Sequence, residues 1–249
     1  MTNGYIAVFD SGIGGISMLN ELIRLMPNER FIYFGDNENA PYGNKSKREL
    51  FELAISGVER LNSFPIKALV LGCNTLSANL IGEIRGYSKV PTFGVFPPIE
   101  RCVVNGERTL VLCTVQTREK IKNHYGVDVV GLKNLASEIE RCAFCLNDVD
   151  FSKNLSLYSV GKFCDKKEYY DTIILGCTHY EFIKNKISDH FRPRKILSGN
   201  FFTAIRVKKY FENHKSLVEN YQNSVLFIGK NAGFNQNFFV LSGQIGSNP

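Results

Sequence analysis

Two cysteines stand at matching places in two similar stretches of the sequence. Cys73 and Cys177 each follow a short apolar run and a single glycine, each precedes polar residues, and Cys177 lies 104 positions after Cys73. A cysteine after an apolar strand is by itself typical of a buried core. A matched pair followed by hydroxyl and amide side chains instead indicates two thiols that act on one substrate.

Two thiols on opposite sides of a cleft suit inversion of configuration at a carbon atom. One thiolate removes a proton from one face, and the opposite thiol delivers a proton to the other face. A thiol pKa of roughly 8.5 can be lowered by helix N-termini and neighbouring donors. Because the α-hydrogen of an amino acid is a far weaker acid, the site must also stabilise a carbanion-like state with aligned donors. We expect these donors to be amides at helix starts and the side chains of Ser11, Asn74, Thr75 and Thr178.

Short apolar runs alternate with helical patterns along most of the chain. The runs predicted as buried strands cover residues 6–9, 31–34, 68–71, 92–95, 110–112, 127–130, 172–175 and 225–228. Apolar residues from Ile16 to Met26 recur at helical spacing, and Ser46 with Glu49 fits the capping box of a second helix. Strands that alternate with helices predict an α/β fold whose parallel sheets are covered on both faces.

The repeat extends beyond the cysteines. The same offset takes Asp10, at the end of one predicted strand, to Thr114, at the end of another. Two similar α/β domains that face a shared cleft explain this pattern most simply, because ligands bind beyond the carboxyl ends of parallel strands. We predict a first domain of residues 1–96 and 206–249 and a second domain of residues 97–205, with the crossover near Pro97.

The composition is that of a soluble globular protein, with 44% hydrophobic and 22% charged residues among 249. No apolar run reaches the roughly 18 residues of a membrane span. The N-terminus shows no export pattern, so we expect a cytoplasmic protein without membrane contact. The net charge of +6 is dispersed, which argues against nucleic acid as a partner and leaves a small-molecule substrate.

The seven cysteines are an odd set, which indicates reduced thiols in a chain without an export pattern. Cys102, Cys113 and Cys164 are expected in the core. Cys142 and Cys145 form a CxxC, but no second pair of Cys or His stands nearby at zinc spacing. We therefore expect no metal site.

These motifs resemble the glutamate racemase family of the aspartate/glutamate racemase superfamily. The matching stretches follow the family's order over most of residues 5–200: residues 9–15 (FDSGIGG), Gly35 with Asp36, residues 41–43 (PYG), residues 73–75 (CNT), Thr114 with Thr117, and residues 175–180 (LGCTHY). The FDSGIGG opening separates the sequence from aspartate racemases, and so does His179, where those relatives usually carry Glu. Two cysteine motifs in register with that opening make the resemblance specific.

The resemblance implies two flavodoxin-like domains and interconversion of L- and D-glutamate for peptidoglycan, without pyridoxal phosphate, another cofactor or metal. It implies Cys73 and Cys177 as the acid–base thiols, Asp10 and His179 as residues that tune them, and Glu140 as an assisting acid. Glu138 stands close by, and either glutamate can instead face solvent. Substrate binding is implied for Asp10, Ser11, Pro41, Tyr42, Gly43, Asn74, Thr75, Thr114, Thr117, Thr178 and His179. The family also suggests a homodimer.

Three positions depart from the family's pattern. Asn39 stands where Arg is usual, Glu181 where Pro is usual, and Leu197 where an acidic residue is common. These departures leave open the racemisation of aspartate or another acidic amino acid. A non-catalytic anion-binding protein on the same scaffold is a second alternative, against which the paired cysteines argue. The glycine-rich loop after the first strand also suggests nucleotide binding, but Ser17 stands where a third spaced glycine is required.

Overall fold

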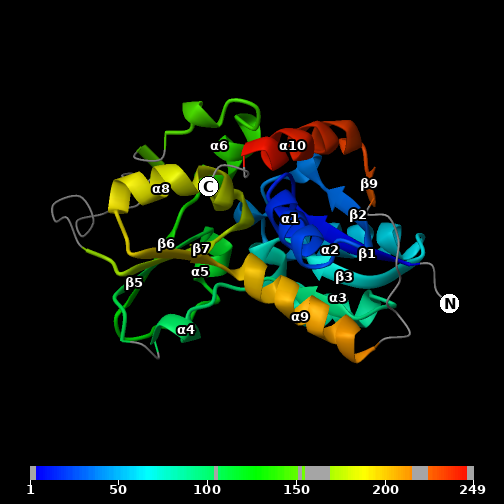
Figure 1. Cartoon of the computed structure of the whole chain (residues 1–249), viewed down its shortest axis with the longest axis horizontal. Coiled ribbons are helices and arrows are strands. Elements are labelled where there is room, and N and C mark those ends of the chain that lie inside the picture. The colour runs from blue at the N-terminus through cyan, green and yellow to red at the C-terminus, as the bar shows by residue number, and fades with distance from the viewer. Residues whose placement is uncertain (1–3, 104–105, 151–152, 155–168, 215–223, 246–249) are drawn as a thin grey trace.

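The chain forms two parallel β-sheets, each covered by helices, that lie side by side in the molecule (Figure 1). The structure, a computed structural model, describes residues 4–103, 106–150, 153–154, 169–214 and 224–245. Cys164, which is expected in the core, lies outside these residues. No helix among the described residues is long and apolar enough to cross a membrane. The predicted α/β fold with parallel sheets is confirmed.

The first sheet has five strands in the order β4-β3-β1-β2-β9. Its strands are β1 (Tyr5–Asp10), β2 (Arg30–Gly35), β3 (Ile66–Leu71), β4 (Thr92–Gly94) and β9 (Ser224–Ile228). The helices that pack around it are α1 (Gly15–Leu25), α2 (Lys47–Asn62), α3 (Asn74–Tyr87), α9 (Gly199–Asn213) and α10 (Ala232–Ile245), with the short 3₁₀ helices η1 (Asn37–Asn39) and η2 (Tyr42–Asn44). We call these elements the first unit.

The second sheet has four strands in the order β6-β5-β7-β8. Its strands are β5 (Thr109–Cys113), β6 (Val127–Gly131), β7 (Thr172–Gly176) and β8 (Lys195–Ser198), and its helices are α4 (Glu100–Val103), α5 (Val115–Arg118), α6 (Leu135–Arg141), α8 (Lys184–Phe191), η3 (Leu146–Asp148) and η4 (Thr178–Ile183). We call these elements the second unit. The order β8-β7-β5-β6 repeats the order β4-β3-β1-β2, so the sequence repeat corresponds to two sheets of the same topology.

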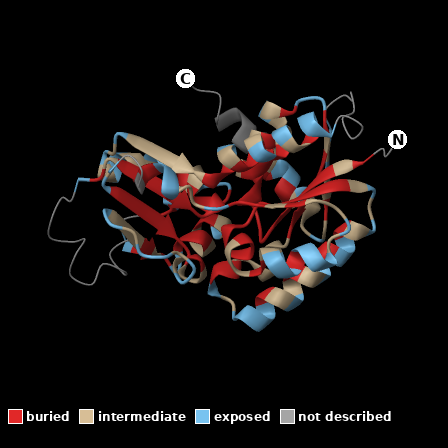
Figure 2. Cartoon of the chain, turned by 90° about the horizontal axis from the view of Figure 1, so that it is seen from below, coloured by how far each residue is buried: buried red, intermediate tan, exposed pale blue. Residues whose placement is uncertain are grey.

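The two faces of the first sheet are set by the alternation of side chains along its strands. Ile6 and Val8 of β1 join a core that includes α1, α9 and α10, while Ala7 and Phe9 join a second core with α2 and α3. The former core continues into the second unit through residues such as Leu112. Figure 2 shows the buried residues running through both sheets and the junction between them.

The observed strands and the start of α2 agree with the predictions from the sequence. Each run predicted as a strand is a strand, and the capping box of Ser46 and Glu49 opens α2 as predicted. The edge strand β8 is not predicted from the sequence. All four of its residues are only half-buried and it begins with Lys195, so it lacks the fully apolar run that identifies a central strand.

The predicted domain boundaries stay a prediction, and the structure suggests a refinement of one of them. Helix α9 continues without interruption past the predicted boundary between residues 205 and 206, and it packs against α1 of the first unit. We therefore propose that the first domain resumes at Gly199, where β8 has ended, and not inside the helix.

The contact between α2 and β1 generates a prediction about stability. A Cβ atom on Gly57 would lie 2.4 Å from the ring of Phe9, whose ring is held between Phe34 and Tyr42. We expect Gly57→Ala to lower the free energy of unfolding by about 1–3 kcal/mol through overpacking. Urea unfolding monitored by circular dichroism measures this change.

Gly82→Ala is the matched control, because Gly82 lies on the exposed face of α3 and a Cβ there would meet nothing within 4 Å. The added methyl group should stabilise the helix by about 0.5–1 kcal/mol. Equal stability of the two variants would contradict the tight packing of α2 on Phe9.

Candidate active site

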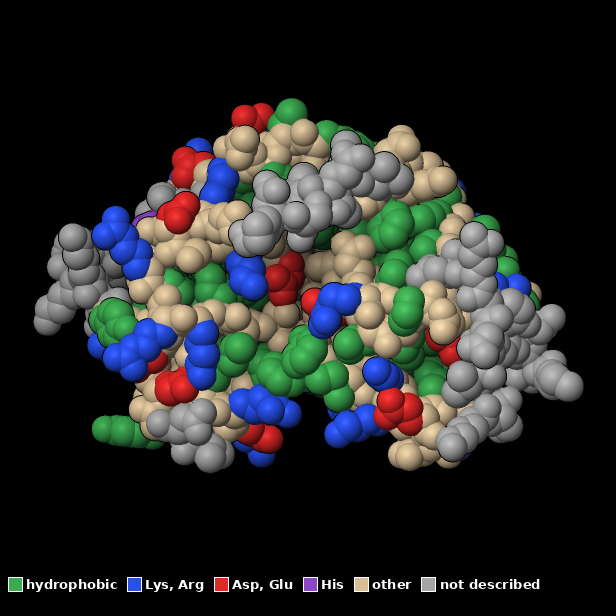
Figure 3. Space-filling model, in the orientation of Figure 1, with side chains coloured by type: hydrophobic (Ala, Val, Ile, Leu, Met, Phe, Trp, Pro, Cys, Tyr) green, Lys and Arg blue, Asp and Glu red, His purple; other side chains and the backbone are tan. Residues whose placement is uncertain are grey.

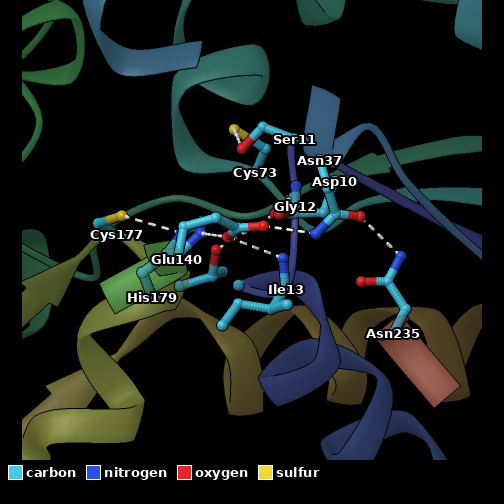
Figure 4. A network of polar contacts seen from close by, with 12 residues as sticks. Asp10, Ser11, Gly12, Ile13, Asn37, Cys73, Glu140, Cys177, His179 and Asn235 are labelled. Carbon is cyan, nitrogen blue, oxygen red and sulfur yellow. Dashed lines mark hydrogen bonds and ion pairs between the residues drawn. The ribbon is translucent and has the colours of Figure 1, made fainter. Parts of the chain in front are cut away.

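Cys73 and Cys177 both lie at the junction between the units (Figure 4). Cys73 follows β3 and directly precedes α3, and Cys177 follows β7 and directly precedes η4. Each side chain is buried, with 6% of its residue surface exposed. The repeat therefore places one thiol in each unit, at the carboxyl end of a strand, where a ligand held between the units would meet both.

The Cys73 thiol is more strongly shielded than the sequence suggests. It contacts Ser11 Oγ at 3.9 Å. Burial, and after it the charge of Asp10, raises the pKa of Cys73 to about 12, although an amide at the start of α3 acts in the opposite direction. The amide at the start of α3 lowers this pKa, as expected of a helix N-terminus, but desolvation outweighs it.

Asp10 joins the loop after β1 to the loop that carries Cys177. The Gly12 amide donates to Asp10 Oδ1 at 2.9 Å, and the Thr178 hydroxyl donates to Asp10 Oδ2 at 3.3 Å. Thr178 directly follows Cys177, so Asp10 of the first unit is tied to the thiol loop of the second. Burial raises the pKa of the Asp10 carboxyl, with His179 acting against this shift.

His179 connects Cys177 to a carboxylate. Its Nδ1 lies 3.8 Å from Cys177 Sγ, and its Nε2 lies 2.7 Å from Glu140 Oε2. Burial disfavours the charged ring, but the hydrogen bonds to Cys177 and Glu140 outweigh burial and raise the pKa of His179 well above its usual value. The Nδ1 atom of His179 therefore lies within hydrogen-bond reach of the Cys177 sulfur.

The glycines of the loop after β1 make room for these two side chains of the second unit. A Cβ atom on Gly12 would lie 2.4 Å from both carboxylate oxygens of Glu140, and one on Gly14 would lie 2.4 Å from His179 Nδ1. The glycines are thus required for the close approach of the units at the site. The space beside the loop, which the sequence pattern also allowed for a nucleotide, is taken up here by Glu140 and His179.

Hydroxyl groups from both units meet beside the cysteines. Thr75 Oγ1 and Thr114 Oγ1 lie 3.0 Å apart across the junction, and the Thr114 hydroxyl donates to Thr117 Oγ1 at 3.0 Å. All three threonines are buried. A Cβ atom on Gly43 would lie 2.7 Å from Thr114, so η2 also closes against the second unit here.

The remaining predicted binding residues surround this cluster less directly. Tyr42 is fully buried and donates to Asp36 Oδ2 at 2.6 Å, while Pro41 is half-buried and precedes η2. The Asn74 amide donates to the Val95 carbonyl at 3.4 Å, so it contributes to the start of α3 as well as lying next to Cys73.

The structure distinguishes the two glutamates of α6. Glu140 contacts His179, whereas Glu138 accepts from the Asp150 amide and from Asn154, away from the cysteines. Residue type and place on one short helix could not separate them, and in the sequence only the family resemblance pointed to Glu140. The contact with His179 in the folded protein distinguishes them independently.

Three further residues near the site are missed by the sequence reasoning. The Tyr33 hydroxyl donates to the Gly12 carbonyl at 2.5 Å, Asn37 donates to Glu140, and Asn235 donates to Asn37 at 2.8 Å. The place of Asn37 directly after Gly35 and Asp36 is a signal that could have identified it. Asn235 lies in a helix near the end of the chain, and no motif marks it.

The departures from the family's pattern lie beside the chemistry. Asn39 donates to both carboxylate oxygens of Asp36 at 3.0 Å, and so supports the partner of Tyr42. Glu181 and Leu197 line a separate cavity of about 440 Å³ between α1, η4, β8 and α9.

The other described cysteines occupy different surroundings. Cys102 and Cys113 are buried in a core on one face of the second sheet, as expected. Cys142 is buried, but Cys145 of the same CxxC is exposed. Within the described part of the chain, no three His, Cys, Asp or Glu side chains gather as they would around a metal ion.

A larger cavity of about 630 Å³ opens between the units, where Figure 3 shows the surface hollowed at its lower edge. Thr117 lines this cavity and links it to the hydroxyl cluster. The lining also includes the basic side chains of Arg101, Lys120, Lys122 and Arg206. Positive charge of this kind attracts small anions.

Comparison with known proteins finds relatives of one family over most of the chain. No family model matches the chain. A glutamate racemase from Clostridium acetobutylicum is 33% identical over 231 residues, which cover 86% of this chain and 87% of the relative. The crystal structure of a glutamate racemase isoform from Bacillus anthracis matches with a TM-score of 0.79 and 28% identity, over 98% of this chain and 95% of that one.

A third similar protein is the glutamate racemase from Francisella tularensis subsp. tularensis, whose crystal structure is in complex with D-glutamate. It matches with a TM-score of 0.74 and 25% identity, over 96% of this chain and 95% of that one. Full-length similarity to curated relatives and to solved structures therefore agrees with the motifs around the two cysteines. The chain belongs to the glutamate racemase family.

Proposed function

We propose that this protein interconverts L- and D-glutamate by proton transfer at the α-carbon, with Cys73 and Cys177 as the two acid–base groups. The observation that carries the proposal is the placement of one buried thiol from each unit at their junction, beside donors from both units. Membership of the glutamate racemase family and the complex of the Francisella relative with D-glutamate support the choice of substrate.

The reaction needs a thiolate on one face of the substrate and a thiol on the other. One sulfur takes the α-proton, and the other gives a proton to the opposite face of the carbanion-like intermediate. Reversal of the two roles gives the reverse reaction. Burial raises the pKa of Cys73 and so favours its thiol form. The ammonium group of bound glutamate would supply a nearby positive charge that favours the thiolate.

The two thiols have different supporting groups. Asp10 and Ser11 lie on the side of Cys73, and His179 with Glu140 lies on the side of Cys177. We assign to His179 the exchange of a proton with Cys177, since its Nδ1 lies 3.8 Å from that sulfur and its pKa is raised. Glu140 then stabilises the charged ring.

The substrate carboxylates require hydrogen-bond donors, and the site contains a group of hydroxyls that can serve. Thr75, Thr114 and Thr117 satisfy one another, and a carboxylate that enters can replace the contact between Thr75 and Thr114 with charge-assisted hydrogen bonds. Such bonds are stronger than those between neutral hydroxyls, so substrate would hold the units together. Ser11, Asn74, Thr178 and the backbone at Tyr42 and Gly43 complete the proposed binding set.

The product of the reaction indicates the cellular role of the protein. D-Glutamate is a building block of peptidoglycan, so we propose that the protein supplies it in the cytoplasm, where cell-wall precursors are made. We also propose a homodimer, on the family resemblance alone. Sedimentation of the purified protein tests the dimer.

We expect the purified protein, freed of metal with a chelator and given no cofactor, to racemise glutamate. Two thiols with aligned donors suffice for the chemistry. Polarimetry with L-glutamate and then with D-glutamate should show optical rotation falling to zero from either side. A rotation that changes only with aspartate would transfer the assignment to the racemisation of another acidic amino acid, the alternative that Asn39 and Leu197 leave open.

We expect Cys73→Ala and Cys177→Ala each to lower kcat/KM by at least about 10²-fold, because a methyl group neither accepts nor donates a proton. Circular dichroism should show an intact fold in both variants. Cys102→Ala is the control: it shortens a buried side chain away from the site, and should cost about 1 kcal/mol of stability with little change in activity. Near-parental activity in either of the first two variants would rule out the paired-thiol mechanism.

The route of the proton tests the two-base mechanism more directly. A proton on sulfur exchanges with solvent between turnovers, so early product formed in deuterium oxide should be almost wholly deuterated at the α-carbon. Recovered substrate of the original hand should stay largely protonated. Mass spectrometry after chiral separation measures both. Substantial retention of the original hydrogen in the product would indicate a single base that serves both faces.

A further inference from the structure

A continuous set of side-chain hydrogen bonds leads from helix α10 to the Cys177 side of the site (Figure 4). Asn235 Nδ2 donates to Asn37 Oδ1 at 2.8 Å, and Asn37 Nδ2 donates to Glu140 Oε1. Glu140 Oε2 in turn contacts His179 Nε2 at 2.7 Å. Asn235 therefore orients the amide of Asn37, Asn37 donates to the Glu140 carboxylate, and that carboxylate contacts the ring next to Cys177.

Residues of the first unit set the orientation of Glu140, which itself belongs to the second unit. Glu140 lies on α6 of the second unit, but Asn37 binds one of its oxygens and the Ile13 amide donates to the other at 3.1 Å. Asn37 and Ile13 both belong to the first unit. Glu140 can therefore take this orientation only when the two units are closed against each other.

Two glycines leave space for this arrangement. A Cβ atom on Gly12 would lie 2.4 Å from the Glu140 carboxylate, and one on Gly35 would lie 2.8 Å from Asn235 Nδ2. Asn235 itself is fully buried. The absence of side chains at Gly12 and Gly35 thus leaves room for the hydrogen-bonded series Asn235–Asn37–Glu140–His179, which we call the relay.

Helix α10 is held against the second unit next to the relay. The Phe238 ring packs on Phe182 at 4.8 Å between centroids, and the Phe234 ring packs on Phe144 at 5.1 Å. Phe144 and Phe182 both belong to the second unit. These aromatic contacts fix the helix that carries Asn235, so Asn37 is supported from a rigid element.

We propose that Asn37, supported by Asn235, is a positioning residue for the reaction: it holds Glu140 so that His179 faces Cys177. The inference rests on the proposed racemase function. Neither asparagine contacts a cysteine, so both act through Glu140. Their effect is confined to proton transfers at Cys177, because the relay ends at His179.

The first test compares single variants in glutamate racemisation. Asn37→Ala should lower kcat about tenfold with KM unchanged within about twofold, because a hydrogen bond to a charged group is lost and substrate contacts are not. Asn37→Asp should lower kcat further, since it replaces the donor with a second carboxylate facing Glu140. Asn235→Ala should have a smaller effect in the same direction.

Glu38→Gln is the matched control. Glu38 lies next to Asn37 in η1 and pairs at the surface with Lys230, just before α10, at 2.9 Å. The Glu38→Gln variant therefore removes another contact between the same two segments without touching the relay, and its kcat should not change. Parental kcat in Asn37→Ala, or an equal loss in Glu38→Gln, would overturn the proposal.

A double-mutant cycle asks whether Asn37 acts through Glu140. In a Glu140→Gln background, Asn37→Ala should lower kcat by less than about twofold. A full tenfold loss in that background would show that Asn37 acts by another route, and would overturn the proposal. Circular dichroism melting of each variant identifies losses that come from unfolding.

The isotope effect of α-deuterated glutamate separates positioning at one thiol from a general structural loss. When transfer at Cys177 is slowed, the effect should rise for the enantiomer whose α-hydrogen Cys177 removes. It should fall for the other enantiomer, because delivery from Cys177 then limits the rate. Opposite changes for the two enantiomers in Asn37→Ala support the proposal, and equal or absent changes overturn it. A parental protein that fails to racemise glutamate would instead refute the proposed function itself.

Discussion

The close approach of the loop after β1 to Glu140 and His179 is the contact on which the site depends. Gly12 and Gly14 lack the Cβ atoms that would collide with these two side chains. Through this approach the first unit orients a carboxylate and an imidazole that belong to the second. Without it, Cys177 would keep its place at the end of β7 but lose the aligned His179, and the two thiols would no longer be parts of one site.

The same closeness has an electrostatic cost. Folding removes four ionisable side chains from water together: Asp10, Cys73, Glu140 and His179. Burial raises the pKa of Asp10 and of Cys73, which favours their neutral forms. The hydrogen bonds from Gly12, Thr178, Ile13 and Asn37 offset part of this cost. The ammonium group of a bound amino acid would add a positive charge beside these groups and offset more of this cost.

Much of the fold and the outline of the site could be predicted from the sequence. The central strands are short apolar runs, and each strand fixes the position of the residues at its end. Asp10, Cys73, Thr114 and Cys177 therefore lie, as predicted, at the carboxyl ends of strands. Contacts between units could not be predicted in this way. Glu138 and Glu140 share a helix, and no spacing pattern separates them, whereas the packing of α6 against η4 brings Glu140 into contact with His179. Asn235 contacts a residue 198 positions away, so no local pattern marks it.

The return of the chain to the first sheet has a consequence for folding. Strands β5 to β8 are contiguous in sequence, so the second sheet can form as soon as residues 109–198 have been synthesised. The first sheet pairs Arg30 of β2 with Ser224 of β9, and this pairing must wait for nearly the whole chain. Long-range parallel pairing of this kind forms slowly and leaves a strand edge uncovered in the meantime. During synthesis, β2 is therefore the segment most in need of protection from aggregation.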